Sequence, residues 1–93
     1  MSINFPLTIK FIYEKEAESC PVIAYTPELD ISSCGKNEKE ARNMLEEAIK
    51  IVLDGAKADG TLDELLKEAG FDKKEQEYIP PRTYFSAFNF QLT

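Results

Sequence analysis

The sequence predicts an α+β fold in which a small, mostly antiparallel sheet is covered on one face by a single long helix. Two observations lead to this prediction. Segments near both ends of the chain carry apolar residues at alternate positions, which is the pattern of half-buried strands. Between them, residues 38–59 carry apolar residues at intervals of three and four, which is the pattern of an amphipathic helix. Because both apolar faces need burial, the economical arrangement lays the helix across the sheet.

Three strands are expected before the long helix. Residues 7–13 alternate, with the apolar side chains of one face at Leu7, Ile9, Phe11 and Tyr13. A charged turn separates them from residues 21–26, "PVIAYT", which are rich in strand-forming side chains and form the hairpin partner. Residues 31–34 form a short third strand, which Gly35 ends because glycine adopts turn conformations at little cost.

The long helix is expected to begin after Asn37 and to end at Gly60. Asn37 is a good N-cap, and Glu40 stands three residues later, where its side chain can reach back to the cap backbone. The apolar stripe of this helix consists of Ala41, Met44, Leu45, Ala48, Ile49, Val52 and Ala56. One face of the helix is therefore expected to pack on the sheet.

A short second helix and a last strand complete the expected order βββα, helix, β. Thr61 and Glu64 repeat the capping pattern before "LDELLKEA", and Gly70 is expected to end this helix in the left-handed conformation, with Phe71 folding back on its leucines. Residues 72–83 are expected to be a linker, because two consecutive prolines favour an extended path. Alternation returns in residues 84–93, with one apolar face formed by Tyr84, Phe88, Phe90 and Leu92. This segment is expected to be the fourth strand.

Composition limits the classes of function. A chain of 93 residues makes one small domain with a thin core, which favours self-association as a dimer or larger. Its net charge of -6 disfavours direct binding of nucleic acid, because that binding depends on Lys and Arg neutralising phosphates. A basic protein is the better partner.

No apolar run is long enough to cross a bilayer, and the first residues lack the pattern of a secretory signal, so a cytoplasmic protein is expected.

The two cysteines, Cys20 and Cys34, are expected to be free thiols beside strands, because a reducing cytoplasm disfavours a disulfide. Two thiols in a chain without histidine also fall short of the four ligands of a structural zinc site, unless two chains share one metal. No metal or cofactor is therefore expected.

Several short matches resemble the HicB-like antitoxin family of type II toxin-antitoxin systems. In order along the chain, the matching residues are Pro27, Glu28, Leu29, Gly35, Glu40, Ala41, Glu47, Ala48 and Ile49. The resemblance covers roughly residues 7–58. Residue by residue these positions are explained by packing and turn geometry, so they identify a fold and none of them is assigned as a contact or catalytic residue.

The resemblance implies a βββαβ core like a partial RNase H fold, and a role in binding and silencing a small basic mRNA-cleaving toxin of the HicA type. Many members of the family also carry a C-terminal DNA-binding domain, and here residues 1–93 are expected to form a single HicB-like domain without one. The exposed sheet face would present Ile12, Ile23 and Tyr25, either to a partner or to a second copy.

Two alternatives remain from the sequence. One is a self-associating domain without a toxin partner. The other is a metal-dependent nuclease, for which the candidate ligands are Glu14, Glu28, Asp30, Glu46 and Glu47. Because no histidine is present to move protons near neutral pH, no enzyme activity is expected.

Overall fold

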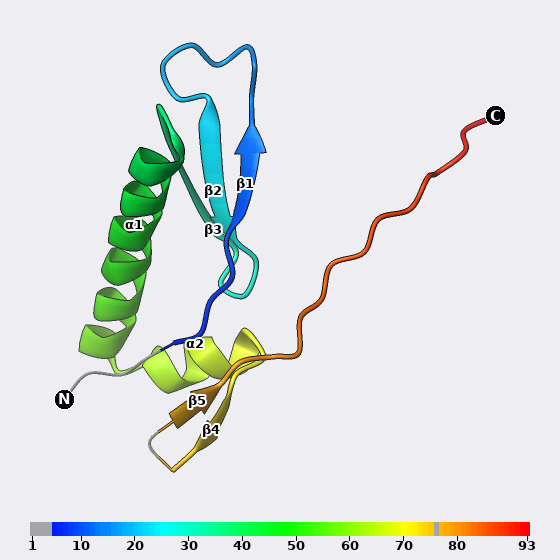
Figure 1. Ribbon diagram of the computed structural model, residues 1–93. Coiled ribbons are helices and arrows are strands. Elements are labelled where there is room, and N and C mark those ends of the chain that lie inside the picture. Colours follow the sequence, from blue (N-terminus) through cyan, green and yellow to red (C-terminus); the bar gives the residue numbers. More distant parts are fainter. Residues whose placement is uncertain (1–4, 76) are drawn as a thin grey trace.

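A computed structural model describes residues 5–75 and 77–93 of the chain. Its elements are β1 (Lys10–Tyr13), β2 (Val22–Thr26), β3 (Ile31–Gly35), α1 (Glu38–Asp59), α2 (Leu62–Glu68), β4 (Asp72–Lys74) and β5 (Glu77–Ile79). The α+β class predicted from the sequence is confirmed. A three-stranded antiparallel sheet carries α1 on one face, while α2 and the β4–β5 hairpin lie together at one end (Figure 1).

The sheet has the strand order β1-β2-β3, with hairpin connections between neighbours. Along β2, side chains alternate strictly: Val22, Ala24 and Thr26 are buried on one face, whereas Ile23 and Tyr25 are half-buried on the other. This alternation follows from the two-residue period of a strand. The buried face is the one that packs on α1, so the opposite face of the sheet remains open.

The core between helix and sheet is small and close-packed. Ala24, Ala41 and Leu45 are completely buried there, with Val22 beside them. The two alanines and Gly35 allow the helix to approach the sheet closely. A Cβ added to Gly35 would lie 2.4 Å from the backbone nitrogen of Ala41, which is far closer than atoms can pack.

Both predicted caps of α1 are present. The backbone N–H of Glu40 donates a 2.8 Å hydrogen bond to Oδ1 of Asn37, and the Glu40 carboxylate accepts from the Lys36 backbone N–H at 3.3 Å. At the other end Gly60 adopts a left-handed φ of 74°, which turns the chain directly into α2. The sequence therefore located this 22-residue helix to within a residue at each end.

A second cluster joins α2 to the β4–β5 hairpin. The buried residues of this cluster are Leu66, Phe71 and Tyr78. The centroids of the Phe5 and Tyr78 rings are 5.1 Å apart. Phe71 packs back on α2 as predicted, and its N–H donates to the Leu66 carbonyl. The expected linker over residues 72–83 is thus partly wrong, because β4 and β5 pair as a hairpin whose Tyr78 packs with Leu66 of α2.

The expected last strand is also wrong in position. Residues 80–93 adopt neither helix nor strand, and they run away from the rest of the molecule as an extended segment (Figure 1). We call residues 83–93 the C-terminal tail. A strand requires a neighbour with which to exchange backbone hydrogen bonds, and among the described residues the tail has none.

The expectation of two free thiols is wrong in this structure, where Cys20 and Cys34 form a disulfide. Cys34 lies on β3 opposite Ile23 of β2, and Cys20 lies just before β2. The bond therefore links the β1–β2 loop to the edge of the sheet. The prediction of free thiols rested on the expected cellular compartment. It did not consider that the pairing of β2 with β3 places Cys20 close to Cys34.

Candidate protein-interaction surface

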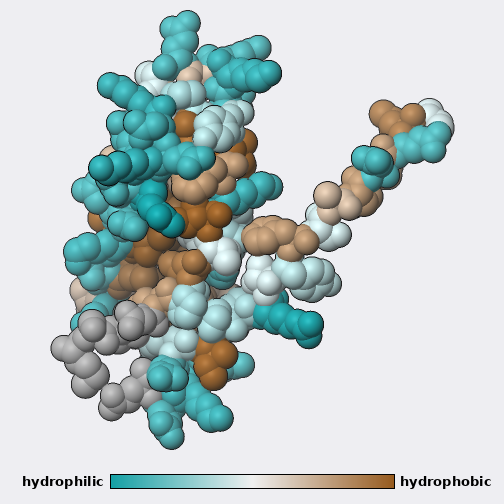
Figure 2. All heavy atoms as spheres, viewed as in Figure 1, coloured by the Kyte–Doolittle hydropathy of each residue, from teal (hydrophilic) through white to brown (hydrophobic). Residues whose placement is uncertain are grey.

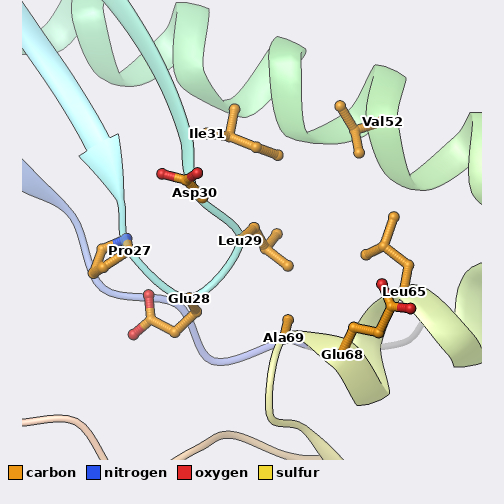
Figure 3. Close-up of a pocket in the computed structure, with 9 residues that line it drawn as sticks. All are labelled: Pro27, Glu28, Leu29, Asp30, Ile31, Val52, Leu65, Glu68 and Ala69. Atoms are coloured by element: carbon orange, nitrogen blue, oxygen red, sulfur yellow. The ribbon is translucent and has the colours of Figure 1, made fainter.

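A hollow of about 470 Å³ lies where the β2–β3 turn faces α1 and α2. Figure 3 shows four aliphatic side chains, from the turn, β3 and both helices, pointing into the same space. They are Leu29, Ile31, Val52 and Leu65. The carboxylate of Glu68 lies at the edge of this space, whereas those of Glu28 and Asp30 point away from it. We call this hollow the turn groove.

The turn that supplies one wall of the groove has a defined geometry. Its backbone closes with a 3.3 Å hydrogen bond from the Asp30 N–H to the Pro27 carbonyl. Asp30 itself has a φ of 54°, a left-handed conformation that Asp tolerates better than most residues. The reversal leaves Leu29 half-buried, projecting toward the helices.

Glu28 anchors this turn from the inside. It is only 9% exposed, and its carboxylate accepts hydrogen bonds from the Thr8 hydroxyl at 2.6 Å, the Thr8 backbone N–H at 3.1 Å and the Thr26 hydroxyl at 3.1 Å. A buried carboxylate is costly unless its oxygens are satisfied, and here they are. The turn is consequently tied to the segment before β1.

These contacts set the charge of Glu28. Burial is the largest single influence and raises the pKa of the carboxyl, but the hydrogen bonds from Thr8, from the backbone and from Thr26 together outweigh it. The pKa of Glu28 is therefore lowered from its ordinary value of 4.5, and the group is ionised at neutral pH. Its negative charge is directed inward and serves the fold.

The outward charges around the groove belong to Asp30 and Glu68, both of which are exposed. Asp30 accepts a 2.8 Å hydrogen bond from the Tyr25 hydroxyl. That bond, with smaller effects of burial and nearby negative charge, raises the pKa of Tyr25. Glu68 forms no ion pair with another residue among those described. The turn groove therefore has an apolar floor and an acidic edge.

The residues of the family resemblance fall into two groups. Pro27, Glu28 and Leu29 line the turn groove. The others lie along the β3–α1 connection and α1, where Gly35 and Ala41 are buried, Ala48 and Ile49 are half-buried, and Glu40 and Glu47 are exposed. Only the first group belongs to the candidate site; the second positions the helix that forms its far wall.

The carboxylates considered as metal ligands lie in three parts of the fold. Glu46 and Glu47 are exposed on α1, and Glu14 is exposed in the β1–β2 loop. In the β2–β3 turn, Asp30 accepts a hydrogen bond from the Tyr25 hydroxyl, and Glu28 accepts hydrogen bonds from the hydroxyls of Thr8 and Thr26. Among the described residues, no three His, Cys, Asp or Glu side chains are grouped so that they could hold an ion.

Sequence reasoning missed most of the groove. Val52 was assigned to the core stripe of α1, yet it remains 39% exposed at the groove. Leu65, Glu68 and Ala69 come from a helix whose placement depends on the left-handed turn at Gly60. The direction of α2 relative to α1 after that turn cannot be predicted from a local sequence pattern.

No protein-family model matches this chain, and neither a curated protein nor a solved structure matches it. Every helix in the described part of the chain is too short or too polar to cross a lipid bilayer. The geometry of the groove and the pattern of residues around it are therefore the basis for any functional argument.

Proposed function

We propose that this chain is a HicB-like antitoxin, or an orphan homologue of one, that binds and occludes a small basic protein. The toxin implied by the family resemblance is an mRNA-cleaving protein of the HicA type. The observation that carries the proposal is the turn groove, in which four aliphatic side chains meet an exposed carboxylate beside the Pro27–Leu29 turn.

The groove suits a long cationic side chain. The aliphatic part of a lysine or arginine would pack against Leu29 and Leu65, while its charged end would reach Glu68 at the edge. A charge-assisted hydrogen bond of that kind is stronger than a neutral one. The groove therefore favours basic residues over acidic or purely apolar ones.

The overall charge acts in the same direction. With a net charge of -6, the chain attracts a basic protein over distances longer than any contact, and this raises the rate of association. Attraction of this kind is weakened by salt, because counterions screen exposed charges beyond about 8 Å at physiological ionic strength.

Silencing of a toxin by occlusion needs a stable surface and no reactive group. The inward-facing Glu28 fits that role, since its hydrogen bonds to Thr8 and Thr26 hold the turn in place.

The first experiment is co-expression with any small basic protein encoded next to this chain, followed by size-exclusion chromatography and a binding assay. The expected result is one complex at low salt, with an association rate that falls as salt rises. Two separately eluting proteins at low salt would contradict the proposal.

A matched pair of variants locates the contact. Val52→Asp places a charge in the turn groove, whereas Ile51→Asp places the same charge on the neighbouring position of α1, which is 72% exposed and outside the groove. Val52→Asp is expected to weaken binding by about tenfold or more, as loss of a central contact does, and Ile51→Asp to leave it nearly unchanged. Equal effects of the two variants would exclude the groove as the contact.

A further inference from the structure

The C-terminal tail exposes more apolar surface than any other part of the described chain. Its large side chains are 65% to 88% exposed: Tyr84, Phe85, Phe88, Phe90 and Leu92. In Figure 2 the hydrophobic residues of the tail stand clear of the body. Large apolar side chains gathered on one exposed segment indicate an interaction site, unlike residues scattered singly over a surface.

The tail has the composition of a β-strand that has not been paired. Aromatic residues favour strands, and residues 83–93 contain no charged residue that would keep such a segment in water. Among the described residues, the backbone donors and acceptors of the tail are also unpaired, and the hydrogen bond that the tail makes is from the Thr83 hydroxyl to the Pro81 carbonyl. The edge of a sheet would supply hydrogen-bond partners for the backbone of the tail and apolar neighbours for its side chains.

The sheet offers such an edge at β1. In the order β1-β2-β3, β1 exchanges hydrogen bonds with β2 on one side only. Phe11, Ile12 and Tyr13 lie on this strand, and the last two are 38% and 62% exposed. Cross-strand pairs of aromatic and β-branched side chains are among the most favourable. An incoming aromatic strand would find suitable neighbours on both faces of β1.

The other edge strand is less suitable. β3 has the sequence "ISSCG", in which two serines and a glycine offer little apolar surface to a neighbour. β4 and β5 are only three residues long, and β4 reads "DKK". Charged residues on short edge strands discourage further pairing. The β1 edge is therefore the acceptor.

The exit of the tail directs it away from its own sheet. Pro80 and Pro81 stiffen the chain where the tail begins. Pro81 packs so closely over Gly70 that a Cβ added to that glycine would lie 3.1 Å from Pro81 Cβ. The radius of gyration, 15.7 Å, exceeds the roughly 12 Å typical of a compact chain of this length. A stiff exit of this kind favours pairing with another molecule.

We propose that residues 83–92 add as a strand to the β1 edge of a second copy of this chain, and that the exchange is reciprocal. Donor and acceptor are both present in one chain, so a two-fold arrangement satisfies both tails and both edges. Each aromatic side chain carries about 150–250 Å² of surface, so two tails with four aromatics each bring an area within the range of about 1,200–2,000 Å² that stable interfaces bury.

The test is the mass of the full chain in solution, by light scattering after size exclusion. At micromolar concentration the expected mass is twice that of the 10.6 kDa chain. The double change Phe88→Asp with Phe90→Asp is expected to halve it, while Asn89→Asp, which adds charge at the intervening position on the other face, is expected to leave the dimer intact. A wild-type monomer, or a dimer that survives the double change, would overturn the proposal.

Amide hydrogen exchange separates strand addition from looser contact. In the dimer, those amides of the tail that face the four residues of β1 are expected to be protected together with the β1 amides on that edge. Both groups are expected to lose protection in the Phe88→Asp, Phe90→Asp variant. A dimer with rapidly exchanging tail amides would exclude a paired strand, and a monomer with protected tail amides would show that the tail folds back on its own sheet. Neither result bears on toxin binding, so this inference stands apart from the proposed function.

Discussion

The hydroxyl of Thr8 donates a 2.6 Å hydrogen bond to Oε2 of Glu28, and so joins the segment before β1 to the turn after β2. Thr8→Val keeps the shape of the side chain but removes this donor. Hydrogen bonds to a buried charge are worth about 1.5–3 kcal/mol, so the free energy of unfolding is expected to fall by about that amount in urea denaturation. Thr93→Val, an exposed position outside the residues proposed to pair, is the control and is expected to leave the free energy of unfolding unchanged.

The same carboxylate makes stability depend on acid. The pKa of Glu28 is lower in the folded chain than its ordinary value of 4.5, so the unfolded chain binds the proton first as pH falls. The stabilisation is complete well above pH 4.5 and is lost as pH falls from there through the lowered pKa. Glu28→Gln is expected to flatten the dependence of unfolding free energy on pH in this window. An unchanged slope would show that Glu28 is not the responsible group.

Gly35 is expected to tolerate no side chain. An added Cβ would meet the backbone of Glu40 and Ala41, which cannot move without displacing α1. Gly35→Ala is therefore expected to destabilise the fold by about 2–3 kcal/mol, as overpacking does. Gly55→Ala is the matched control, because a Cβ there meets nothing within 4 Å and alanine is the better helix former by about 0.5–1 kcal/mol. Thermal melting should move in opposite directions for the two variants.

The disulfide is expected to stabilise the oxidised chain. Cys20 and Cys34 are 14 residues apart, and closing a loop of that size lowers the entropy of the unfolded chain by an amount worth about 3 kcal/mol. Addition of a reductant should lower the urea midpoint of the wild-type chain. A Cys20→Ser, Cys34→Ser variant should be equally stable with and without reductant. An unchanged urea midpoint of the wild-type chain on addition of reductant would show that the disulfide does not stabilise the fold.

Tyr78 provides a test at alkaline pH. Its hydroxyl donates a hydrogen bond to Asp63, and that bond, followed by burial and the negative charge of Asp63, raises the pKa of Tyr78 above 10.0. The corresponding stabilisation is present below pH 10 and is lost as pH rises through the raised pKa. Asp63→Asn should lower the pKa of Tyr78, measured from its ring carbon by NMR. Glu38→Gln, which removes the partner of Tyr13, should leave Tyr78 unchanged.

Features set by neighbouring residues in the sequence were predicted correctly, whereas features set by packing between distant segments were missed. Asn37 and Gly60 bound α1 because each cap acts within one turn of the helix, so both ends were predicted correctly. The hairpin at residues 72–79 was missed since its turn has no glycine or asparagine; Glu75 adopts a φ of 59° instead. Packing against α2 overrides the local preference there.

The tail and the groove could not be predicted for a different reason. Alternation in residues 84–93 predicts a strand that the structure does not contain, because a pattern cannot supply the neighbour that a strand requires. Leu29, Val52 and Leu65 meet at the groove only because two helix ends fix the angle between α1 and α2. Sites assembled from several elements depend on these angles.

The exposed tail also bears on how the chain is best prepared. A purification tag fused after Thr93 would extend the aromatic segment with polar or charged residues, close to Phe90 and Leu92. Such a tag would interfere with any surface that the tail covers, and samples tagged there would report a different assembly from untagged ones. Cleavable fusion at the opposite end of the chain, removed before measurement, avoids that artefact.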